Sequence, residues 1–171
     1  MKIIVLGGSG FVGKSVVRRL DQLDQEVFSL SRGNGLELLN LKCVEKRFAE
    51  IRPDVIVNCA AHVGSVHYGL KHPATIFHDN MQMILNLFLA VSETCRDAVL
   101  INPISNCVYP MDAEVQVESQ LWAGMPHPTA LPYASTRRMI YVISKSYNEE
   151  YGISSKNLIL PGVYGPGNHT D

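Results

Sequence analysis

The chain has 171 residues, of which 46% are hydrophobic and 18% are charged, which indicates one domain with a sizeable core rather than a disordered segment. Its net charge of −1 at pH 7 predicts no nucleic-acid partner and no membrane partner, although local basic groups remain able to bind a phosphate. The four cysteines form no CxxC pair and the six histidines no HExxH or HxH pattern, so we expect reduced thiols, a cytoplasmic location and no metal site.

Short apolar runs alternate with stretches of helical spacing along the chain. In chain order the pattern predicts strand 2–8, helix 11–23, strand 26–32, helix 39–51, strand 54–61, helix 78–95, strand 98–105, helix 133–152 and strand 156–166. The first strand is too short for a signal peptide, and no run is long enough to cross a bilayer. The alternation is typical of the α/β class, and we predict a Rossmann-type doubly wound parallel sheet with helices on both faces.

A glycine-rich stretch, "VLGGSGFVGKS", separates the first predicted strand from the first helix and satisfies both GxxGxxG and GxGxxG. Glycines at this place let backbone N–H groups approach a pyrophosphate, whose charge is favoured by the N-terminus of the helix. We therefore predict a dinucleotide site, a plain tight turn being the alternative. The expected contacts are Gly7, Gly10, Phe11, Val12 and Gly13.

The end of the second predicted strand bears on the choice of cofactor. Sheets that bind NAD usually carry an acidic residue there for the ribose hydroxyls, whereas this strand ends in Ser31-Arg32, with no acid before Glu37. A guanidinium suits a 2′-phosphate, so Arg32 favours NADP, with NAD as the alternative. An arginine that is merely solvated at the start of a loop would look the same.

Five stretches carry a family resemblance, namely "GGSGFVG", "RPDVIVNCAA", "SNCVYP", "PYASTR" and "LPGVYGPGN". In their order and spacing they resemble the extended short-chain dehydrogenase/reductases, the NAD-dependent epimerase/dehydratase superfamily that acts on sugar nucleotides. The branch most similar is GDP-L-fucose synthase, on "AAHVGSV", "HPATIFHDNMQM" and "SNCVYP". The resemblance covers essentially all 171 residues but only the N-terminal, NAD(P)-binding part of that family, so we expect its C-terminal substrate domain to be absent.

The resemblance implies a catalytic set. In the family a tyrosine exchanges a proton with the substrate as hydride moves between the nicotinamide and the sugar. A cation four residues after that tyrosine lowers its pKa, and a serine or threonine hydroxyl binds the substrate oxygen. Ser105 and Tyr133 match, Arg137 stands where the family has lysine, and Cys107 matches the acid/base cysteine of epimerisation. We expect Arg137 to depress the pKa of Tyr133, with turnover slow, altered or absent because a guanidinium differs in shape from an ammonium.

A second tyrosine, Tyr141, has the literal YxxxK spacing with Lys145. It lies two turns deeper in the same predicted helix among apolar residues, so we expect it to be buried between the sheet and a neighbouring helix and to take no part in chemistry. Arg138 is expected to be solvated. Histidine 169 is given no role.

Softer expectations complete the site. Asn40 would meet the adenine, Asn80 would support the active-site backbone, and Val63, Gly64 and Ser65 would begin a loop facing the substrate. Further cofactor contacts are expected from Ala60, Ala61, Tyr133, Pro161 and Val163.

The implied activity is an NADP-dependent epimerase/reductase of a 4-keto-6-deoxy nucleotide sugar. Another sugar-nucleotide epimerase, dehydratase or reductase of the superfamily, and a dinucleotide-binding module without turnover, are the alternatives. The helices over 81–95 and 134–149 are apolar on more than one face, which predicts a homodimer.

Overall fold

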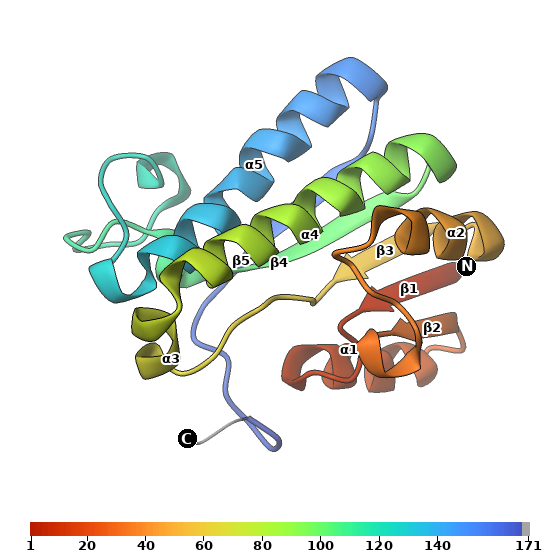
Figure 1. Ribbon diagram of the computed structural model, residues 1–171, viewed down its shortest axis with the longest axis horizontal. Helices are drawn as coiled ribbons and strands as arrows, with labels where there is room; N and C mark the ends of the chain where they lie inside the picture. Colours follow the sequence, from red (N-terminus) through yellow and green to blue (C-terminus); the bar gives the residue numbers. More distant parts are fainter. Residues whose placement is uncertain (169–171) are drawn as a thin grey trace.

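A single parallel sheet organises the chain. The computed structural model describes residues 1–168, so histidine 169 lies outside the described residues. Five strands are ordered β2-β1-β3-β4-β5 and every neighbouring pair is parallel (Figure 1). The strands are β1 (Lys2–Leu6), β2 (Glu26–Leu30), β3 (Val55–Asn58), β4 (Val99–Ser105) and β5 (Ser155–Leu160).

Helices cover both faces of the sheet, as predicted for a Rossmann-type fold. The helices are α1 (Phe11–Asp21), α2 (Leu41–Ile51), α3 (Val66–Lys71), α4 (Pro73–Thr94) and α5 (Leu131–Tyr151). One core cluster joins the sheet to α2, α4 and α5 through side chains such as Phe48, Phe88 and Ile140. A smaller cluster joins the opposite face to α1, whose Val16, Val17 and Leu20 pack against Ile3, Val5 and Val57. In Figure 1, α1 lies on the opposite side of the sheet from α2, α4 and α5.

The strand β1 lies inside the sheet and shows why its strands can be recognised in the sequence as short apolar runs. Ile3, Ile4, Val5 and Leu6 are each at most 4% exposed, because β2 and β3 flank the strand and helices cover both its faces. β-branched side chains suit such a pleated, doubly buried surface. The chain crosses back to the same edge after each strand, so the loops that follow the strands gather at their carboxyl ends.

Two helical features differ from expectation. Helix α3 was not predicted because its six residues are too few to show a period; its one sequence signal is Ser65, whose hydroxyl accepts the Tyr68 N–H at 3.2 Å as an N-cap. Helix α4 begins at Pro73 rather than at residue 78, since proline is well suited to the first turn of a helix. Both differences add helical residues next to the loop that follows β3.

Candidate functional site

Two adjoining cavities form a groove along the carboxyl edge of the sheet. The first, about 380 Å³, is lined by residues that follow β1, β2 and β3. The second, about 340 Å³, is lined by residues from the start of α1 and from the ends of β3, β4 and β5. Cys59, Ala60 and Ala61 line both cavities. In open α/β sheets this edge is where ligands bind.

The glycine loop contributes to both cavities, since Gly7 and Gly10 line the first and Phe11 and Val12 line the second. Gly7 has a φ of +70°, and a Cβ there would lie 2.9 Å from the backbone of Ala60. A Cβ on Gly13 would lie 2.8 Å from the Gly8 Cα and closer still to the Gly7 carbonyl oxygen. Helix α1 starts after Gly10 and has no acidic residue in its first turn, so its N-terminal amides are available to an anion. This loop, which we call the glycine cradle, therefore requires glycine at both positions, because side chains there would collide with protein backbone.

The first cavity carries the basic residue expected from the sequence. Ser31, Arg32 and Gly33 line it, and Arg32 is exposed and has no ion pair among residues 1–168. Asn40 behaves differently from expectation: its side chain accepts the Cys43 N–H at 3.2 Å as the N-cap of α2, and within the described chain it lines neither cavity. Its neighbour Leu39 takes the place facing the cavity.

The second cavity brings together most of the residues expected to act on substrate. It is lined by Phe11, Val12, Ala60, Ala61, Ser105, Tyr133, Arg137, Pro161 and Val163. Ser105 ends β4, and its hydroxyl oxygen accepts the Cys107 N–H at 3.4 Å. Tyr133 lies in the first turn of α5, which brings it to the same edge. Cys107 is next to this cavity in the chain but is not one of the residues that line it.

Arg137 is a buried cation. It is 2% exposed, its Nη2 donates to the Asn80 Oδ1 at 2.9 Å, and its guanidinium carbon lies 5.2 Å from the centre of the Tyr133 ring. Its Nε has no hydrogen-bond partner, and Arg137 has no ion pair in the part of the chain that the structure describes. Asn80, fully buried, also accepts the backbone N–H of His62 and donates to its carbonyl, so it ties Arg137 to the loop after β3.

The acidities in this cavity differ from expectation. Burial raises the pKa of the Tyr133 phenol above its usual value, and the positive charge of Arg137 offsets this only in part. Burial likewise raises the pKa of the Cys107 thiol, against smaller lowering effects of a hydrogen bond with Ser105 and of Arg137. Arg137 does lower the pKa of Tyr133, as expected, but desolvation of the phenolate outweighs this attraction, so the pKa as a whole is raised.

Tyr141 lies outside the groove. The expectation that it is buried is also wrong: its side chain is 48% exposed, 6.4 Å from the Trp122 ring between centres. Lys145 is exposed as well and lies 3.8 Å from Glu149. Two turns of helix carry this pair away from the edge of the sheet, so the spacing YxxxK occurs here on an open helix face.

Arg138 is not solvated, contrary to expectation. It is 7% exposed, its Nε donates to the Val108 carbonyl at 2.7 Å and its Nη2 to the Gly124 carbonyl at 2.9 Å. Its guanidinium carbon also lies 5.5 Å from the centre of the Trp122 ring. Arg138 therefore fastens the long segment between β4 and α5 to the helix that carries Tyr133.

Replacing Arg138 by methionine should destabilise the fold by about 2–4 kcal/mol, because two carbonyls lose a charged donor. Urea unfolding followed by circular dichroism measures this loss. Lys145→Met is the matched control, since that exposed lysine should contribute less than about 0.5 kcal/mol. Equal unfolding midpoints for the two variants would contradict a structural role for Arg138.

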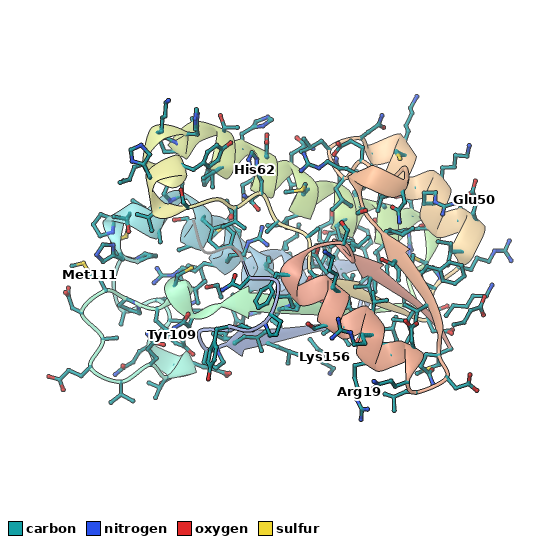
Figure 2. All side chains as sticks on the ribbon, turned by 90° about the horizontal axis from the view of Figure 1, so that it is seen from below. Arg19, Glu50, His62, Tyr109, Met111 and Lys156 are labelled. Atoms are coloured by element: carbon teal, nitrogen blue, oxygen red, sulfur yellow. The ribbon has the colours of Figure 1, made fainter. Side chains whose placement is uncertain are left out.

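Two residues of the first cavity were not anticipated. His62 follows the shared Cys59–Ala61 segment, and Asp79 lies on α4 (Figure 2 labels His62 beside this helix). The Asp79 carboxylate contacts the ring of His62 at 2.8 Å and that of His78 at 3.0 Å, and hydrogen bonds from His78 and then from His62 lower the pKa of Asp79. Only contact between elements distant in sequence brings His62 and Asp79 together, so no periodicity could reveal the pair.

Other kinds of site were also sought. Within residues 1–168, no group of three or more histidine, cysteine or acidic side chains is arranged to hold a metal ion. None of the helices in that part of the chain has the length and apolar character needed to cross a membrane.

Comparison with known proteins places the chain in a family. The model of the NAD dependent epimerase/dehydratase family matches residues 3–171. The chain belongs to this family. The resemblance seen in the five sequence stretches is thus confirmed.

Two of the relatives with similar sequences are GDP-L-fucose synthases. GDP-L-fucose synthase of Escherichia coli is 30% identical over 166 residues, which are 96% of this chain and 51% of that protein. The GDP-L-fucose synthase of Dictyostelium discoideum is 29% identical over 167 residues, covering 96% of this chain and 52% of the relative. The chain therefore spans about half the length of the curated relatives it matches.

Solved structures share the fold. A GDP-mannoheptose C4 reductase from Campylobacter jejuni with NADP bound superimposes with a TM-score of 0.88 at 23% identity, covering 98% of this chain and 53% of that one. A UDP-glucose 4-epimerase from Thermotoga maritima gives a TM-score of 0.80 at 25% identity, over 98% and 57% of the two chains.

Proposed function

We propose that residues 1–171 form the cofactor-binding domain of an NADP-dependent nucleotide-sugar epimerase/reductase of the GDP-L-fucose synthase type, acting on a 4-keto-6-deoxy nucleotide sugar. One observation carries the proposal: Ser105, Tyr133 and Arg137 line a single cavity that adjoins the glycine cradle. The GDP-L-fucose synthases among the relatives support the substrate class.

The residues present fit a dinucleotide. The cradle formed by Gly7, Gly10 and Gly13 would hold the diphosphate, Arg32 the 2′-phosphate of NADP, and Pro161 and Val163 the nicotinamide end. When bound, NADPH would supply the hydride for the sugar C4. The NADP-bound relative from Campylobacter jejuni is consistent with this choice.

The roles of the side chains follow from their chemistry. Tyr133 would give its hydroxyl proton to the C4 oxygen, while Ser105 would hold the same oxygen by a hydrogen bond. Arg137 would stabilise negative charge on the Tyr133 oxygen as the proton leaves. Cys107 would exchange the proton α to the ketone in the epimerisation, and its raised pKa makes the thiolate scarce but strongly basic.

The test follows NADPH absorbance when the protein meets GDP-4-keto-6-deoxymannose in a single turnover. Oxidation of NADPH that depends on the sugar supports the proposal. A dinucleotide-binding module without turnover is the second candidate, favoured by Arg137 in place of lysine and by its bond to Asn80. Binding of NADPH without oxidation would support this second candidate. Arg137→Lys should then restore turnover if the guanidinium in place of the family's ammonium is what prevents it.

Arg32→Ala should weaken NADPH binding about tenfold or more and leave NADH binding nearly unchanged, because only NADPH carries the 2′-phosphate. Calorimetric titration with both cofactors measures the two affinities. Arg18→Ala removes the same charge from the exposed surface of α1 and serves as the control. An equal loss for NADPH and NADH would contradict the assignment of NADP.

We also propose a homodimer through α4 and α5, which lie side by side on one face (Figure 1). On α4, Phe77, Leu85 and Leu89 are 45%, 45% and 38% exposed, and on α5 Tyr141 and Val142 are 48% and 43% exposed. Sedimentation at micromolar concentration should show a dimer for the unchanged chain and a monomer for Leu85→Glu. A monomer for both proteins would contradict the proposed dimer.

The four free thiols support a cytoplasmic location.

A further inference from the structure

Two polar side chains of the first cavity, His62 and Asp79, take no part in the proposed chemistry. Both line the cavity, and their side chains are 31% and 20% exposed, so neither is sealed inside the protein. His62 Nδ1 lies 2.8 Å from Asp79 Oδ2, and His78 Nδ1 lies 3.0 Å from Asp79 Oδ1. Each carboxylate oxygen therefore has one imidazole partner and keeps the capacity to accept a further hydrogen bond.

Hydrogen bonds hold this pair in place. The backbone N–H of His62 donates to Asn80 Oδ1 at 3.1 Å, and Asn80 Nδ2 donates to the His62 carbonyl oxygen at 2.7 Å. His62 Nε2 also lies 3.1 Å from the Tyr68 hydroxyl. Hydrogen bonds from His78 and then from His62 lower the pKa of Asp79, so its side chain is ionised at neutral pH and only accepts hydrogen bonds. The wall of the cavity thus carries a fixed negative acceptor.

A carboxylate at this place restricts which part of a dinucleotide it can face. The diphosphate and the 2′-phosphate are negative and would be repelled, and the proposed function places them on the glycine cradle and on Arg32. The adenosine half of NADPH then offers two kinds of donor, the 3′-hydroxyl of its ribose and the 6-amino group of its adenine. Asp79 should therefore face one of these two groups.

The apolar lining of the cavity favours the base. Leu36, Leu38, Leu39 and Met83 line the same cavity, and a flat base buries more apolar surface on such side chains than a ribose does. Met83 lies four residues after Asp79 on α4, so the two side chains project from the same face of the helix. A base that packs against Met83 thus brings its polar edge to Asp79.

We infer that Asp79, held by His62, accepts a hydrogen bond from the 6-amino group of the cofactor's adenine and makes the cavity selective for bases that carry this amine. The inference rests on the proposed function, which places NADPH in the groove. It adds a contact for the base to those proposed for the phosphates. Asp79 is a specificity-determining residue, and His62 is a positioning residue that acts through it.

The test titrates the full chain calorimetrically with NADPH and with its purine analogue, in which hydrogen replaces the 6-amino group and nothing else changes. NADPH should bind about tenfold more tightly, the effect of one hydrogen bond to a charged group. In Asp79→Ala the two affinities should differ by less than about twofold, because the acceptor is gone. Equal binding of both cofactors to the unchanged chain, or a preference that persists in Asp79→Ala, overturns the inference alone. Binding of neither cofactor overturns the proposed function as well.

Two further variants separate recognition of the amine from a loosened loop, which would weaken both cofactors alike and leave the ratio of their affinities unchanged. Asp79→Asn keeps the shape and an acceptor but not the charge, and should retain a preference for NADPH of about threefold. His62→Ala removes one of the two imidazole partners of Asp79 and should also reduce the preference to about threefold. An unchanged ratio in both variants overturns the inference.

Glu37 is the rival carboxylate, since it lines the same cavity. Its Oε1 accepts the Leu39 N–H at 3.0 Å, so Glu37→Ala should alter the loop and leave the ratio of the two affinities unchanged. Loss of the preference in Glu37→Ala, together with its persistence in Asp79→Ala, would assign the amine to the wrong carboxylate here and overturn the inference. Asp21→Ala, at an exposed acid of α1 that lines neither cavity, is the control.

Discussion

Gly13→Ala should abolish measurable NADPH binding and destabilise the fold by about 1–3 kcal/mol, the usual cost of overpacking. The new methyl would overlap the Gly7 carbonyl and lie 2.8 Å from the Gly8 Cα, and these are backbone atoms that no rotamer change can move aside. The loop must shift, and with it the amides expected to hold the diphosphate. Calorimetry with NADPH and urea unfolding measure the two effects.

Ser15→Ala provides the control for that variant. Ser15 lies two residues further along α1 and is exposed, so the same residue type is introduced into the same helix without a clash. Affinity and stability should stay near those of the unchanged chain. If Gly13→Ala binds NADPH as tightly as Ser15→Ala does, the glycine loop is only a turn and does not hold the diphosphate.

Tyr133→Phe should reduce hydride transfer to a 4-keto-6-deoxy nucleotide sugar by ~100- to 10,000-fold, the usual range for loss of a general acid. The ring is kept, so its contact with the Arg137 guanidinium at 5.2 Å and the affinity for NADPH should persist. Single-turnover oxidation of NADPH measures the chemical step, and calorimetry measures the affinity.

Tyr141→Phe is matched to that variant in residue type and in helix. Because Tyr141 is 48% exposed and lies two turns away, its loss of a hydroxyl should leave the rate unchanged. The opposite result, a slow Tyr141→Phe and an unaffected Tyr133→Phe, would move the chemistry to the Tyr141–Lys145 pair and out of the groove.

The strands and the glycine loop were predictable because each depends on local sequence. Residues 3–6 of β1 are an apolar run and are all buried, and Gly13 occupies a place where only glycine fits. The family resemblance predicted that Ser105 and Tyr133 share one site, and they line the same cavity, Ser105 from the end of β4 and Tyr133 from the first turn of α5.

The features that escaped prediction depend on tertiary contacts. Arg138 is buried because carbonyls of a distant segment happen to meet it, and Tyr141 is exposed because no helix of the described chain covers its face. The contact of His62 with Asp79 joins residues that no motif links. The pKa of Tyr133 likewise depends on how deeply its ring is buried, and the four-residue spacing between Tyr133 and Arg137 gives no information on that burial.

The raised pKa of Tyr133 affects how the rate depends on pH. A phenol that holds its proton through neutral and mildly alkaline pH is ready to act as an acid, as ketone reduction requires, but is seldom the phenolate that alcohol oxidation would need. At a given pH a catalyst speeds both directions of its reaction alike, so the raised pKa sets the pH dependence of the rate and not the direction of the reaction. A step that consumes the phenolate should become faster as the pH is raised toward the pKa of Tyr133, whereas a step that needs the phenol should slow down.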